Sequence, residues 1–343
     1  MSWSVLIPDR LSPPADVEAA TLGKDVIFDM PAAGDGGTIP DAMWRRADAV
    51  LAWHEVRLHA GVIAKLDQCK VIVRVGAGFD NVDLEAAGGR GIPVCNVPDY
   101  GTNDVADHAM SLYLGLARGI SGYDRAARGG AWSWDCAGPL NRVTGATLGI
   151  IGLGRIGTAV AIRAKAFGLR VLFHDPYKPV GYDKALGIER TFRLEELLAQ
   201  ADAVTLHIPL TEETKHLAGK DFFRVLKKGA IFVNTARGAC CDLEALHDAL
   251  RSERLRAAGL DVLEQEPPDT RHPLIQAWRL QDEWLAGRLL ITPHAAFYNR
   301  ESYAELRTKA AEEARRVLTG HLPLSCVNTQ WLTSAAILPD RVR

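Results

Sequence analysis

Short apolar runs alternate with helical or turn-rich stretches along the first part of the chain. We predict strands at residues 5–7, 26–28, 49–53 and 71–73. Alternation of this kind is typical of a parallel sheet whose strands are joined by helical crossovers. The pattern therefore predicts a small parallel α/β unit at the start of the chain.

The same alternation restarts at Thr147. A strand, a helix closed by Gly168 and a second strand are predicted at residues 147–151, 155–167 and 170–174. Further strands are predicted at residues 203–208, 230–235, 257–262 and 289–292. Ahead of this region, Thr102 can cap a helix over residues 103–119, whose apolar residues lie on nearly every face. Such a helix is expected to be buried between domains or subunits.

The end of the chain predicts that one domain is discontinuous. An amphipathic helix runs from Arg300 through Leu318, and we expect it to pack back on the first domain. A chain of 343 residues also exceeds the usual size of one domain. The predicted fold is α/β with two Rossmann-like domains, in which a domain of residues 101–299 is inserted in a discontinuous flavodoxin-like domain of residues 1–100 and 300–343.

Composition narrows the classes of partner and compartment. The 40 basic and 42 acidic residues nearly cancel, and no basic run of the kind that follows a phosphate backbone occurs, which disfavours direct nucleic-acid binding. No segment has the apolar length of a membrane span or the form of a signal peptide, so we expect a cytoplasmic protein without a membrane partner. The six cysteines form no C-x-x-C pair, which indicates reduced thiols, no metal site and no disulfide framework.

A glycine-rich turn between a predicted strand and helix carries the most specific motif. Gly152, Gly154 and Gly157 have the G-x-G-x-x-G spacing, and Asp175 follows the next strand, eighteen residues beyond Gly157. The first glycine permits a tight turn, the second lets the backbone approach a pyrophosphate, and the third lets the helix lie close to the strand. Asp175 can accept hydrogen bonds from ribose hydroxyls and would repel a 2′-phosphate, so NAD is the predicted cofactor in preference to NADP.

The first turn of the helix after these glycines offers unpaired N–H groups to the phosphates. The predicted cofactor site also includes residues of that turn and residues next to helix or strand ends, namely Thr102, Arg155, Ile156, His207 and Ala236. Lys178, close to Asp175, argues for the opposite cofactor preference. A glycine turn without a ligand is the alternative interpretation of the motif.

Three ionisable side chains follow successive predicted strand ends in the same domain, namely Arg237, Glu266 and His294. The carboxyl ends of parallel strands meet at one edge of the sheet, where ligands bind. Reduction of a 2-oxo acid needs a cation for the carboxylate, a proton donor for the carbonyl oxygen, and a carboxylate that keeps the donor protonated and oriented. Arg237, His294 and Glu266 fit these roles in turn and are the predicted catalytic residues. Taken singly, each has an ordinary alternative as an ion pair, the start of a helix or a loop residue.

Four short strings around these residues, together with the dinucleotide motif, resemble the D-isomer-specific 2-hydroxyacid dehydrogenase family. The strings are Asn234-Thr235-Ala236-Arg237-Gly238, Gly259-Leu260-Asp261-Val262, Glu266-Pro267 and Thr292-Pro293-His294-Ala295-Ala296. The resemblance covers about residues 70 to 328. Within the family, the C-terminal-binding-protein branch is the most similar at residues 74–83, 95–98, 172–177 and 294–298.

The resemblance implies roles for particular residues. It repeats the three catalytic assignments and adds Asp261 as a residue near the nicotinamide ribose. It assigns the substrate carboxylate to backbone N–H groups around Val75, Gly76, Ala77 and Gly78. It also implies a homodimer formed through the cofactor domain.

Two departures from the family pattern concern the substrate pocket. Phe297 stands where the C-terminal-binding-protein branch usually carries Trp. Glu266 and His294 are 28 positions apart, which is longer than the usual spacing in the family. The extra segment contains Trp278 and Trp284, and we expect it to roof the pocket or to extend the dimer contact.

Residues of the first domain complete the predicted substrate site. Trp53, His54 and Arg74 are placed to line the pocket together with Phe297, or else are core and surface residues. His108, on the predicted buried helix, is interpreted as a hydrogen-bonded core histidine.

The sequence therefore predicts an oxidoreductase that transfers a hydride between NAD(H) and C2 of a small 2-oxo or 2-hydroxy acid of the D configuration, with His294 as general acid and base. The alternative is an NAD(H)-sensing dimeric scaffold or corepressor similar to the C-terminal-binding proteins. The complete catalytic trio and the short tail after Asn328 favour the enzyme. The family resemblance disfavours a formate dehydrogenase, which carries Gln at the position of Glu266, and the short tail disfavours a long-form phosphoglycerate dehydrogenase.

Overall fold

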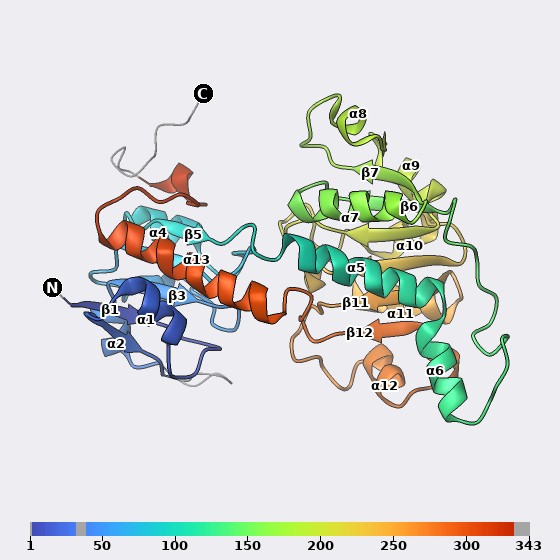
Figure 1. Ribbon diagram of the computed structural model, residues 1–343, viewed down its shortest axis with the longest axis horizontal. Coiled ribbons are helices and arrows are strands. Elements are labelled where there is room, and N and C mark those ends of the chain that lie inside the picture. Colours follow the sequence, from blue (N-terminus) through green and yellow to red (C-terminus); the bar gives the residue numbers. More distant parts are fainter. Residues whose placement is uncertain (1, 32–38, 333–343) are drawn as a thin grey trace. The chain divides into compact units, whose positions relative to one another are not determined.

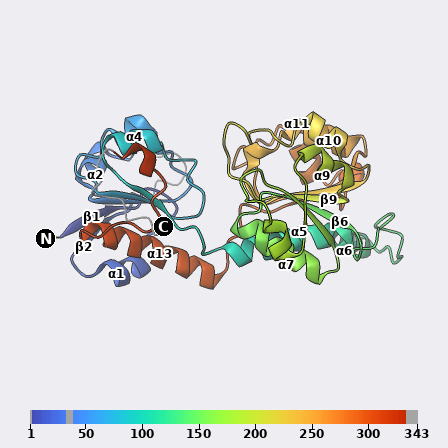
Figure 2. The ribbon, with the colours of Figure 1, turned by 90° about the horizontal axis from the view of Figure 1, so that it is seen from above.

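The computed structural model describes residues 2–31 and 39–332 and separates into two compact units. Unit 1 consists of Met1–Gly101 and Asn299–Arg343, and unit 2 consists of Thr102–Tyr298. Residues 1, 32–38 and 333–343, which belong to the predicted first domain, lie outside the described residues. Each unit contains a parallel sheet with helices on both faces (Figure 2), which confirms the predicted α/β class with two Rossmann-like folds.

Unit 1 is built around a parallel sheet with the strand order β2-β1-β3-β4-β5. Its strands are β1 (Trp3–Leu6), β2 (Val26–Asp29), β3 (Ala49–Ala52), β4 (Val71–Arg74) and β5 (Val94–Asn96). Its helices are α1 (Asp16–Leu22), α2 (Asp41–Arg46), α3 (Ala60–Ile63), α4 (Leu84–Gly89), α13 (Arg300–Leu318) and the 3-10 helix η3 (Thr329–Trp331). Every residue of β3 and β4 is buried, because both faces of the sheet are covered.

Helix α13 follows unit 2 in the sequence but packs on α1, β3 and β4 of unit 1 (Figure 1). Its first turn is capped by Asn299, whose side-chain oxygen accepts a hydrogen bond from the N–H of Ser302 at 2.7 Å. Arg307 of α13 pairs with Glu18 of α1 through two contacts of 2.6 and 2.8 Å, and both side chains are buried. A buried charge needs such a partner, so this bidentate pair fixes the position of α13 against α1.

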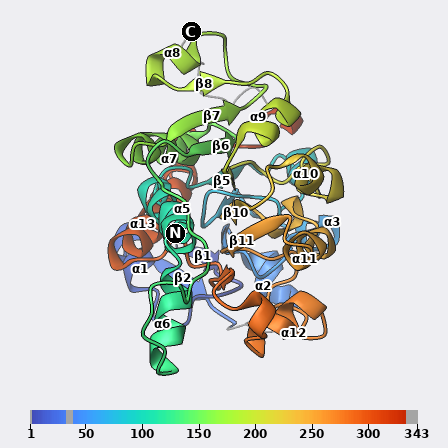
Figure 3. The same ribbon diagram turned by 90° about the vertical axis from the view of Figure 1, so that its right-hand side faces the viewer.

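Unit 2 is built around a parallel sheet with the strand order β12-β11-β10-β9-β6-β7-β8 (Figure 3). Its strands are β6 (Thr147–Ile151), β7 (Arg170–His174), β8 (Glu189–Arg190), β9 (Ala203–Leu206), β10 (Ala230–Asn234), β11 (Leu255–Leu260) and β12 (Leu289–Ile291). The order reverses between β6 and β9, since the chain builds outward in one direction and then crosses to the other. In open parallel sheets this switch point is where a ligand binds, at the carboxyl ends of the strands.

Helices cover both faces of this sheet, with α5 and α7 on one side and α9, α10 and α11 on the other (Figure 3). The helices of unit 2 are α5 (Thr102–Ala117), α6 (Ile120–Arg128), α7 (Arg155–Ala166), α8 (Tyr182–Leu186), α9 (Leu194–Gln200), α10 (Lys220–Val225), α11 (Leu243–Arg251) and α12 (Pro273–Arg279). Two 3-10 helices, η1 (Gly238–Cys240) and η2 (Glu283–Leu285), complete the described elements.

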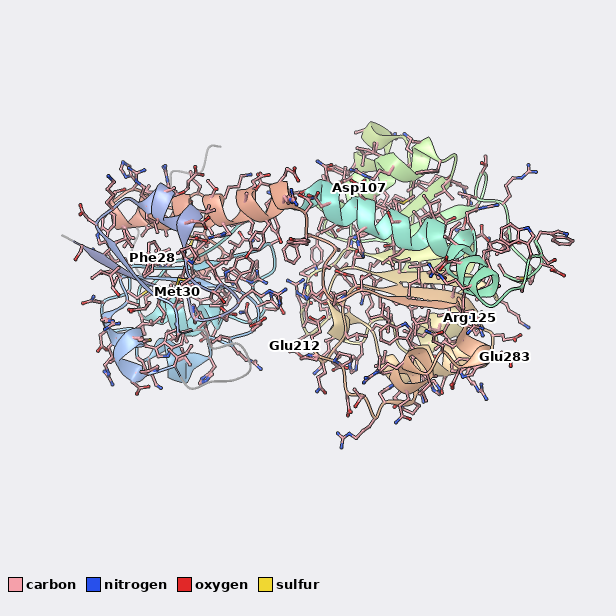
Figure 4. All side chains as sticks on the ribbon, turned by 60° about the horizontal axis from the view of Figure 1, so that its bottom comes forward. Phe28, Met30, Asp107, Arg125, Glu212 and Glu283 are labelled. Atoms are coloured by element: carbon pink, nitrogen blue, oxygen red, sulfur yellow. The ribbon has the colours of Figure 1, made fainter. Side chains whose placement is uncertain are left out.

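Helix α5 differs from its prediction in two respects. It begins with Thr102 itself, whereas Thr102 was predicted to precede the helix as its cap. The prediction of apolar residues on nearly every face is wrong for one stripe, where Asn103, Asp107 and Ser111 are exposed. These polar residues recur every four positions and so share one helix face, on which Figure 4 labels Asp107.

Six predicted strands extend past the observed ones at their carboxyl ends, by one residue at β1, β3, β10 and β12 and by two residues at β9 and β11. Strand β9 ends at Leu206 and β11 ends at Leu260, so that His207 and Asp261 begin the loops that follow. Strands β5 and β8 were not predicted, because three and two residues are too few to produce a visible alternation. None of the helices in the described part of the chain has the length and apolar character needed to cross a bilayer.

Candidate active site

The loops after β10, β11 and β12 begin side by side at the carboxyl edge of the unit 2 sheet. The register pairs Asn234 with Leu260, and Leu260 with Ile291, so the last residues of the three strands lie level. The predicted catalytic residues Arg237 and His294 follow within a few positions of the first and third strand ends. Parallel pairing therefore collects residues that are far apart in the sequence.

The carboxylate of Asp261 holds two of these loops together. It is 2% exposed and accepts hydrogen bonds from the Thr292 hydroxyl at 2.6 Å and from the N–H groups of Ala295 and Ala296 at 2.9 Å each. Its own backbone carbonyl accepts the N–H of His294 at 2.8 Å. A buried carboxylate needs hydrogen-bond donors, and here the turn after β12 supplies them. The conformation of the His294 turn is thus tied to the end of β11.

His294 and Glu266 are in direct contact. The Nδ1 atom of His294 lies 2.7 Å from Oε2 of Glu266, and Oε1 of Glu266 accepts the N–H of Leu263 at 2.9 Å. The backbone of His294 has a φ of 52°, in the left-handed region that side chains other than glycine rarely adopt. Such conformations persist only where surrounding contacts impose them, and they concentrate at functional sites.

The loop that carries Arg237 is fixed by a buried asparagine. The side-chain oxygen of Asn234 accepts the N–H of Ala236 at 3.0 Å, and its amide group donates to the carbonyl of Arg237 at 2.9 Å. The Arg237 guanidinium donates to the carbonyl of Ala236 at 2.8 Å. Both ends of the Asn234 amide are used, so the backbone around Arg237 has one conformation.

Gly238 brings this loop against the one that carries Glu266. A Cβ atom at Gly238 would lie 1.9 Å from the carbonyl carbon of Leu263 and 2.3 Å from the nitrogen of Glu264. Only glycine permits this approach between two backbones. The structure therefore joins Arg237, Glu266 and His294 through contacts between their loops.

His108 reaches the same edge from helix α5. Its Nε2 atom lies 2.9 Å from the Thr292 hydroxyl oxygen and 3.7 Å from Oδ1 of Asp261. The interpretation of His108 as a hydrogen-bonded histidine fits these contacts, although the side chain is partly exposed and its partners belong to the site. The sequence analysis did not assign a role to Thr292. Its position two residues before His294 was the signal that could have identified it as a residue of the site.

The glycine turn has the geometry that a bound pyrophosphate requires. Gly152 has a φ of 86°, and a Cβ atom there would lie 2.5 Å from the carbonyl oxygen of His207. A Cβ atom at Gly157 would lie 2.1 Å from the carbonyl oxygen of Gly152. At Gly154, which precedes α7, a Cβ atom would meet no protein atom within 4 Å. The first and third glycines thus serve the fold, whereas the second faces space that a phosphate can occupy.

Asp175 lies next to this turn. Its two carboxylate oxygens accept the N–H of Leu153 at 2.8 Å and of Tyr177 at 2.9 Å. A carboxylate oxygen can accept more than one hydrogen bond, so both can still accept ribose hydroxyls. His207 packs on the other side of the turn, its Nε2 lies 3.0 Å from the Thr205 hydroxyl, and burial lowers the pKa of His207 to about 3. The ring is therefore neutral at physiological pH, and these residues fit NAD.

The predicted substrate residues Trp53, His54 and Arg74 of unit 1 differ in how far they are buried. Trp53 is 2% exposed and its ring centroid lies 5.6 Å from that of Tyr303 on α13, so it belongs to a core. His54 is partly exposed. Arg74 is buried, donates to the carbonyl of Val75, and has its guanidinium where a Cβ atom of Gly76 would be.

The N–H groups of the loop 75–78 are not equivalent. Those of Val75 and Gly76 donate to the carbonyls of Ala52 and Arg74 at 2.8 and 2.9 Å. The carbonyl of Ala77 accepts the side-chain amide of Asn96 at 2.6 Å, which orients the loop. Within the described residues, no acceptor takes the N–H groups of Ala77 or Gly78.

The long segment between Glu266 and His294 packs on unit 2. The ring of Trp284 lies 5.9 Å from that of His247 and 4.8 Å from the guanidinium of Arg251, both on α11. Arg288 donates to the carbonyls of Leu250 and Leu255 near the amino ends of the strands. Because β12 is parallel to β11, this segment includes the return of the chain from the carboxyl to the amino edge. Trp284 therefore packs on α11 and does not roof the loops of Arg237, Glu266 and His294, whereas an extension of the dimer contact by this segment stays a prediction.

Two further contacts complete the description of unit 2. Arg125 of α6 donates to the carbonyl of Gln281 at 3.2 Å, and Figure 4 labels Arg125 and Glu283 at the same end of unit 2. Phe297 packs edge-on against Tyr298, with ring centroids 6.5 Å apart. Among the described residues, no group of three or more His, Cys, Asp and Glu side chains is arranged to hold a metal ion.

Comparisons with known proteins identify similar chains. Residues 110–296 match the family model described as D-isomer specific 2-hydroxyacid dehydrogenase, NAD binding domain. The chain is 39% identical over 282 residues to D-3-phosphoglycerate dehydrogenase of Methanocaldococcus jannaschii, a match that covers 82% of this chain and 52% of that protein. It thus spans about half the length of this relative. It is 38% identical over 286 residues to glyoxylate reductase of Korarchaeum cryptofilum, covering 82% of this chain and 83% of that protein.

A solved structure supports the same relationship. The crystal structure of D-lactate dehydrogenase from Aquifex aeolicus, complexed with NAD and lactic acid, has a TM-score of 0.83 and 28% sequence identity. The match covers 92% of this chain and 96% of that chain. The NAD-binding domain lies in unit 2, and its cofactor is NAD.

Alanine at two of the glycines is expected to separate cofactor binding from stability. Gly154→Ala keeps the free energy of unfolding but weakens NADH binding about tenfold or more, a loss of about 1.4 kcal/mol, because the added methyl group occupies the phosphate position. Gly157→Ala lowers the free energy of unfolding by about 1–3 kcal/mol, since its methyl group meets the Gly152 carbonyl. Urea denaturation and fluorescence titration with NADH measure both effects. Wild-type NADH affinity in folded Gly154→Ala would contradict the placement of the pyrophosphate.

Replacement of Thr292 tests the hydrogen bonds that hold the His294 turn. Thr292→Val removes the hydroxyl between Asp261 and His108 and is expected to cost about 1–3 kcal/mol of unfolding free energy, because Asp261 loses a buried donor. We also expect a lower kcat, since the turn is less well positioned. Thr292→Ser keeps the hydroxyl and is the matched control. Wild-type stability and kcat in Thr292→Val would show that the hydroxyl does not hold the turn, and losses confined to Thr292→Ser would assign the effect to the methyl group.

Proposed function

The chain belongs to the D-isomer-specific 2-hydroxyacid dehydrogenase family, and we propose that it interconverts a small 2-oxo acid and the corresponding D-2-hydroxy acid. It is an oxidoreductase of the NAD-dependent 2-hydroxyacid dehydrogenase type. The observation that carries the specific proposal is the contact of His294 with Glu266, in loops packed against the Arg237 loop at the edge where parallel sheets bind ligands.

Each proposed catalytic residue has a distinct task. Arg237 binds the substrate carboxylate, for which its planar, permanently charged guanidinium is suited. His294 gives a proton to the carbonyl oxygen during reduction, and its neutral ring takes the hydroxyl proton during oxidation. Because Nδ1 contacts Glu266, Nε2 is the nitrogen that exchanges this proton. Bound NADH supplies the hydride.

Glu266 and Asp261 act through other residues. Glu266 keeps the His294 ring in one orientation, with Nδ1 facing its carboxylate. Asp261, whose carboxylate is engaged by the His294 turn, is proposed to lie near the nicotinamide ribose, as the family resemblance implies. The remaining cofactor contacts are proposed for the residues of the glycine turn and its neighbours, Thr102, Gly152, Gly154, Arg155, Ile156, Gly157, Asp175, His207 and Ala236.

For the substrate carboxylate we propose a second contact, the N–H groups of Ala77 and Gly78. This choice is supported by the hydrogen bonds of the loop. The N–H groups of Val75 and Gly76 already donate to backbone carbonyls, so the next two N–H groups are the ones proposed for the substrate. His54, Arg74 and Phe297 remain proposed substrate contacts. Trp53 is supported as a core residue, because it is almost fully buried against Tyr303.

A homodimer formed through unit 2 is part of the proposal. Trp132 and Trp134, in the segment after α6, are 93% and 85% exposed, and Ile120 of α6 is 59% exposed. Large apolar side chains gathered in one segment are typical of an interaction surface. The segment of Trp278 and Trp284 lies close to α6 and can extend that surface.

We further propose a cytoplasmic enzyme without a nucleic-acid partner.

The alternative, an NAD-sensing scaffold of the C-terminal-binding-protein type, stays a hypothesis. The curated relatives described above are named as a dehydrogenase and a reductase, which favours the enzyme. Similarity to that branch at particular strings does not distinguish the two functions, because a scaffold can retain a dinucleotide site. Turnover distinguishes them.

The central test is turnover of a panel of 2-oxo acids, followed by NADH oxidation, with His294→Gln as the variant. We expect activity in the wild type and a fall of about 10²–10⁴ in kcat for His294→Gln, because a positioned general acid is lost. NADH affinity, measured by fluorescence titration, should change by only a small factor. Absence of turnover by the wild type across the panel would favour the scaffold, and equal loss of NADH binding would give His294 a structural role.

Asp175 is expected to set the preference for NAD over NADP. Asp175→Ala should narrow the ratio of kcat/KM between NADH and NADPH, because the carboxylate that repels a 2′-phosphate is removed. Asp175→Asn is the variant of matched size, since it lacks the charge and keeps an acceptor for one of the two N–H groups of Leu153 and Tyr177. If repulsion between the Asp175 carboxylate and the 2′-phosphate sets the preference, both variants lower the ratio of kcat/KM with NADH to kcat/KM with NADPH. A wild type that prefers NADPH would refute the role of Asp175.

A further inference from the structure

Two cysteines of unit 1 face each other where the segment after α13 pairs antiparallel with strand β5. Cys95 is the central residue of β5, the edge strand of its sheet, and Cys326 lies in the segment after α13. The N–H of Val327 donates to the carbonyl of Val94 at 2.8 Å, and the N–H of Asn96 donates to the carbonyl of Ser325 at 3.3 Å. These two backbone hydrogen bonds lie on either side of the cysteines. Cys95 and Cys326 are therefore directly opposite each other, in a non-hydrogen-bonded position of the antiparallel pairing.

This register meets the geometric requirement of a disulfide. In a non-hydrogen-bonded pair the Cα atoms lie about 4.5 Å apart and the side chains approach closely. A disulfide needs Cα atoms about 4.4–6.8 Å apart and Cβ atoms about 3.5–4.5 Å apart. The backbone therefore does not have to move far for the sulfur atoms to bond.

We propose that Cys95 and Cys326 are a redox modification site, at which a peroxide converts the two thiols to a reversible disulfide that fastens the segment after α13 to the edge of the unit 1 sheet.

The surroundings of the thiols determine the order of the reaction. Cys95 is fully buried, whereas Cys326 is partly exposed and also contacts the side-chain oxygen of Asn328 at 3.3 Å. The adjacent Cys95 thiol lowers the pKa of Cys326 to about 7, whereas the Cys326 thiol and burial raise the pKa of Cys95. The buried carboxylate of Glu313 opposes ionisation of both thiols. Cys326 is therefore the thiolate that reacts first.

The chemical steps balance with hydrogen peroxide as the oxidant. The Cys326 thiolate attacks one peroxide oxygen, the O–O bond breaks, and hydroxide leaves after an S–O bond has formed, which gives a sulfenic acid. The Cys95 sulfur then attacks the sulfenic sulfur, the S–O bond breaks, and water leaves as the S–S bond forms. Two thiols are oxidised and one peroxide is reduced to two waters. A dithiol such as dithiothreitol reverses the reaction by exchange.

Other cysteines of the chain provide the comparison. Cys69 is also in unit 1, but burial raises its pKa to about 12, and its sulfur donates to the carbonyl of Val71. Cys240 and Cys241 are neighbours in sequence and buried, and burial raises the pKa of Cys241. These thiols are expected to react slowly with peroxide. Selective pairing of Cys95 with Cys326 is the distinguishing expectation.

Peptide mass mapping of the native protein tests the proposal. The full chain, reduced and then freed of reductant, is treated with hydrogen peroxide, alkylated and digested without reduction. We expect peptides containing Cys95 and Cys326 to be joined, with the loss of two hydrogens, and separated again by dithiothreitol. Because the link closes a long loop, it should also raise Tm. Random pairing among the cysteines, or a link that forms only after unfolding in urea, would overturn the proposal.

Variants identify the role of each thiol. Cys326→Ser should abolish both the link and the rise in Tm, whereas Cys69→Ser, the matched control, should retain both. Cys95→Ser should leave Cys326 as a sulfenic acid that dimedone traps. If Cys326 is not labelled in a folded Cys95→Ser protein, then Cys326 is not the residue that peroxide oxidises, and the proposal fails. Mapping of the wild type is decisive if Cys95→Ser does not fold. NADH binding is not part of this test, so its outcome is independent of the proposed enzyme activity.

Discussion

The candidate active site depends on the buried carboxylate of Asp261. A charge at the end of a buried strand must be compensated, and three donors of the turn after β12 compensate it. These hydrogen bonds to Asp261 fix the conformation of the turn after β12. In this conformation His294 has a φ of 52° and its ring contacts Glu266. The unusual backbone of His294 is thus a consequence of satisfying Asp261, and the same contacts give the imidazole one orientation.

Close packing between backbones positions the other two loops at the carboxyl edge of the unit 2 sheet, those that carry Arg237 and Glu266. Gly238 lets the Arg237 loop touch the backbone at Leu263, and the N–H of Leu263 in turn holds Glu266. The parallel arrangement explains why these residues are separated in sequence, since each strand must be followed by a return to the amino edge. In the last crossover this return occupies the segment with Trp284, which packs on α11.

Sequence patterns predicted what depends on local chemistry. The strands of 147–151 and 170–174, the glycine turn between them and the α/β class follow from apolar runs and from backbone positions that tolerate only glycine. Contacts between distant residues were beyond such patterns: Thr292 lies 184 positions from His108, and nothing local announces their hydrogen bond. Strand ends were also imprecise, because β11 ends at Leu260 whereas the strand predicted from the sequence extended to Val262.

The discontinuity of unit 1 has a physical explanation in its edge strand. Strand β5 would present unpaired N–H and C=O groups, which is a liability in any sheet. The segment after α13 pairs with it on both sides of Cys95, and the buried Asn328 side chain accepts the N–H of Val94 and donates to the carbonyl of Ile92. A chain that ended with unit 2 would leave this edge open and would leave Glu18 without Arg307. The return of the chain therefore completes the first unit in both its sheet and its helical layer.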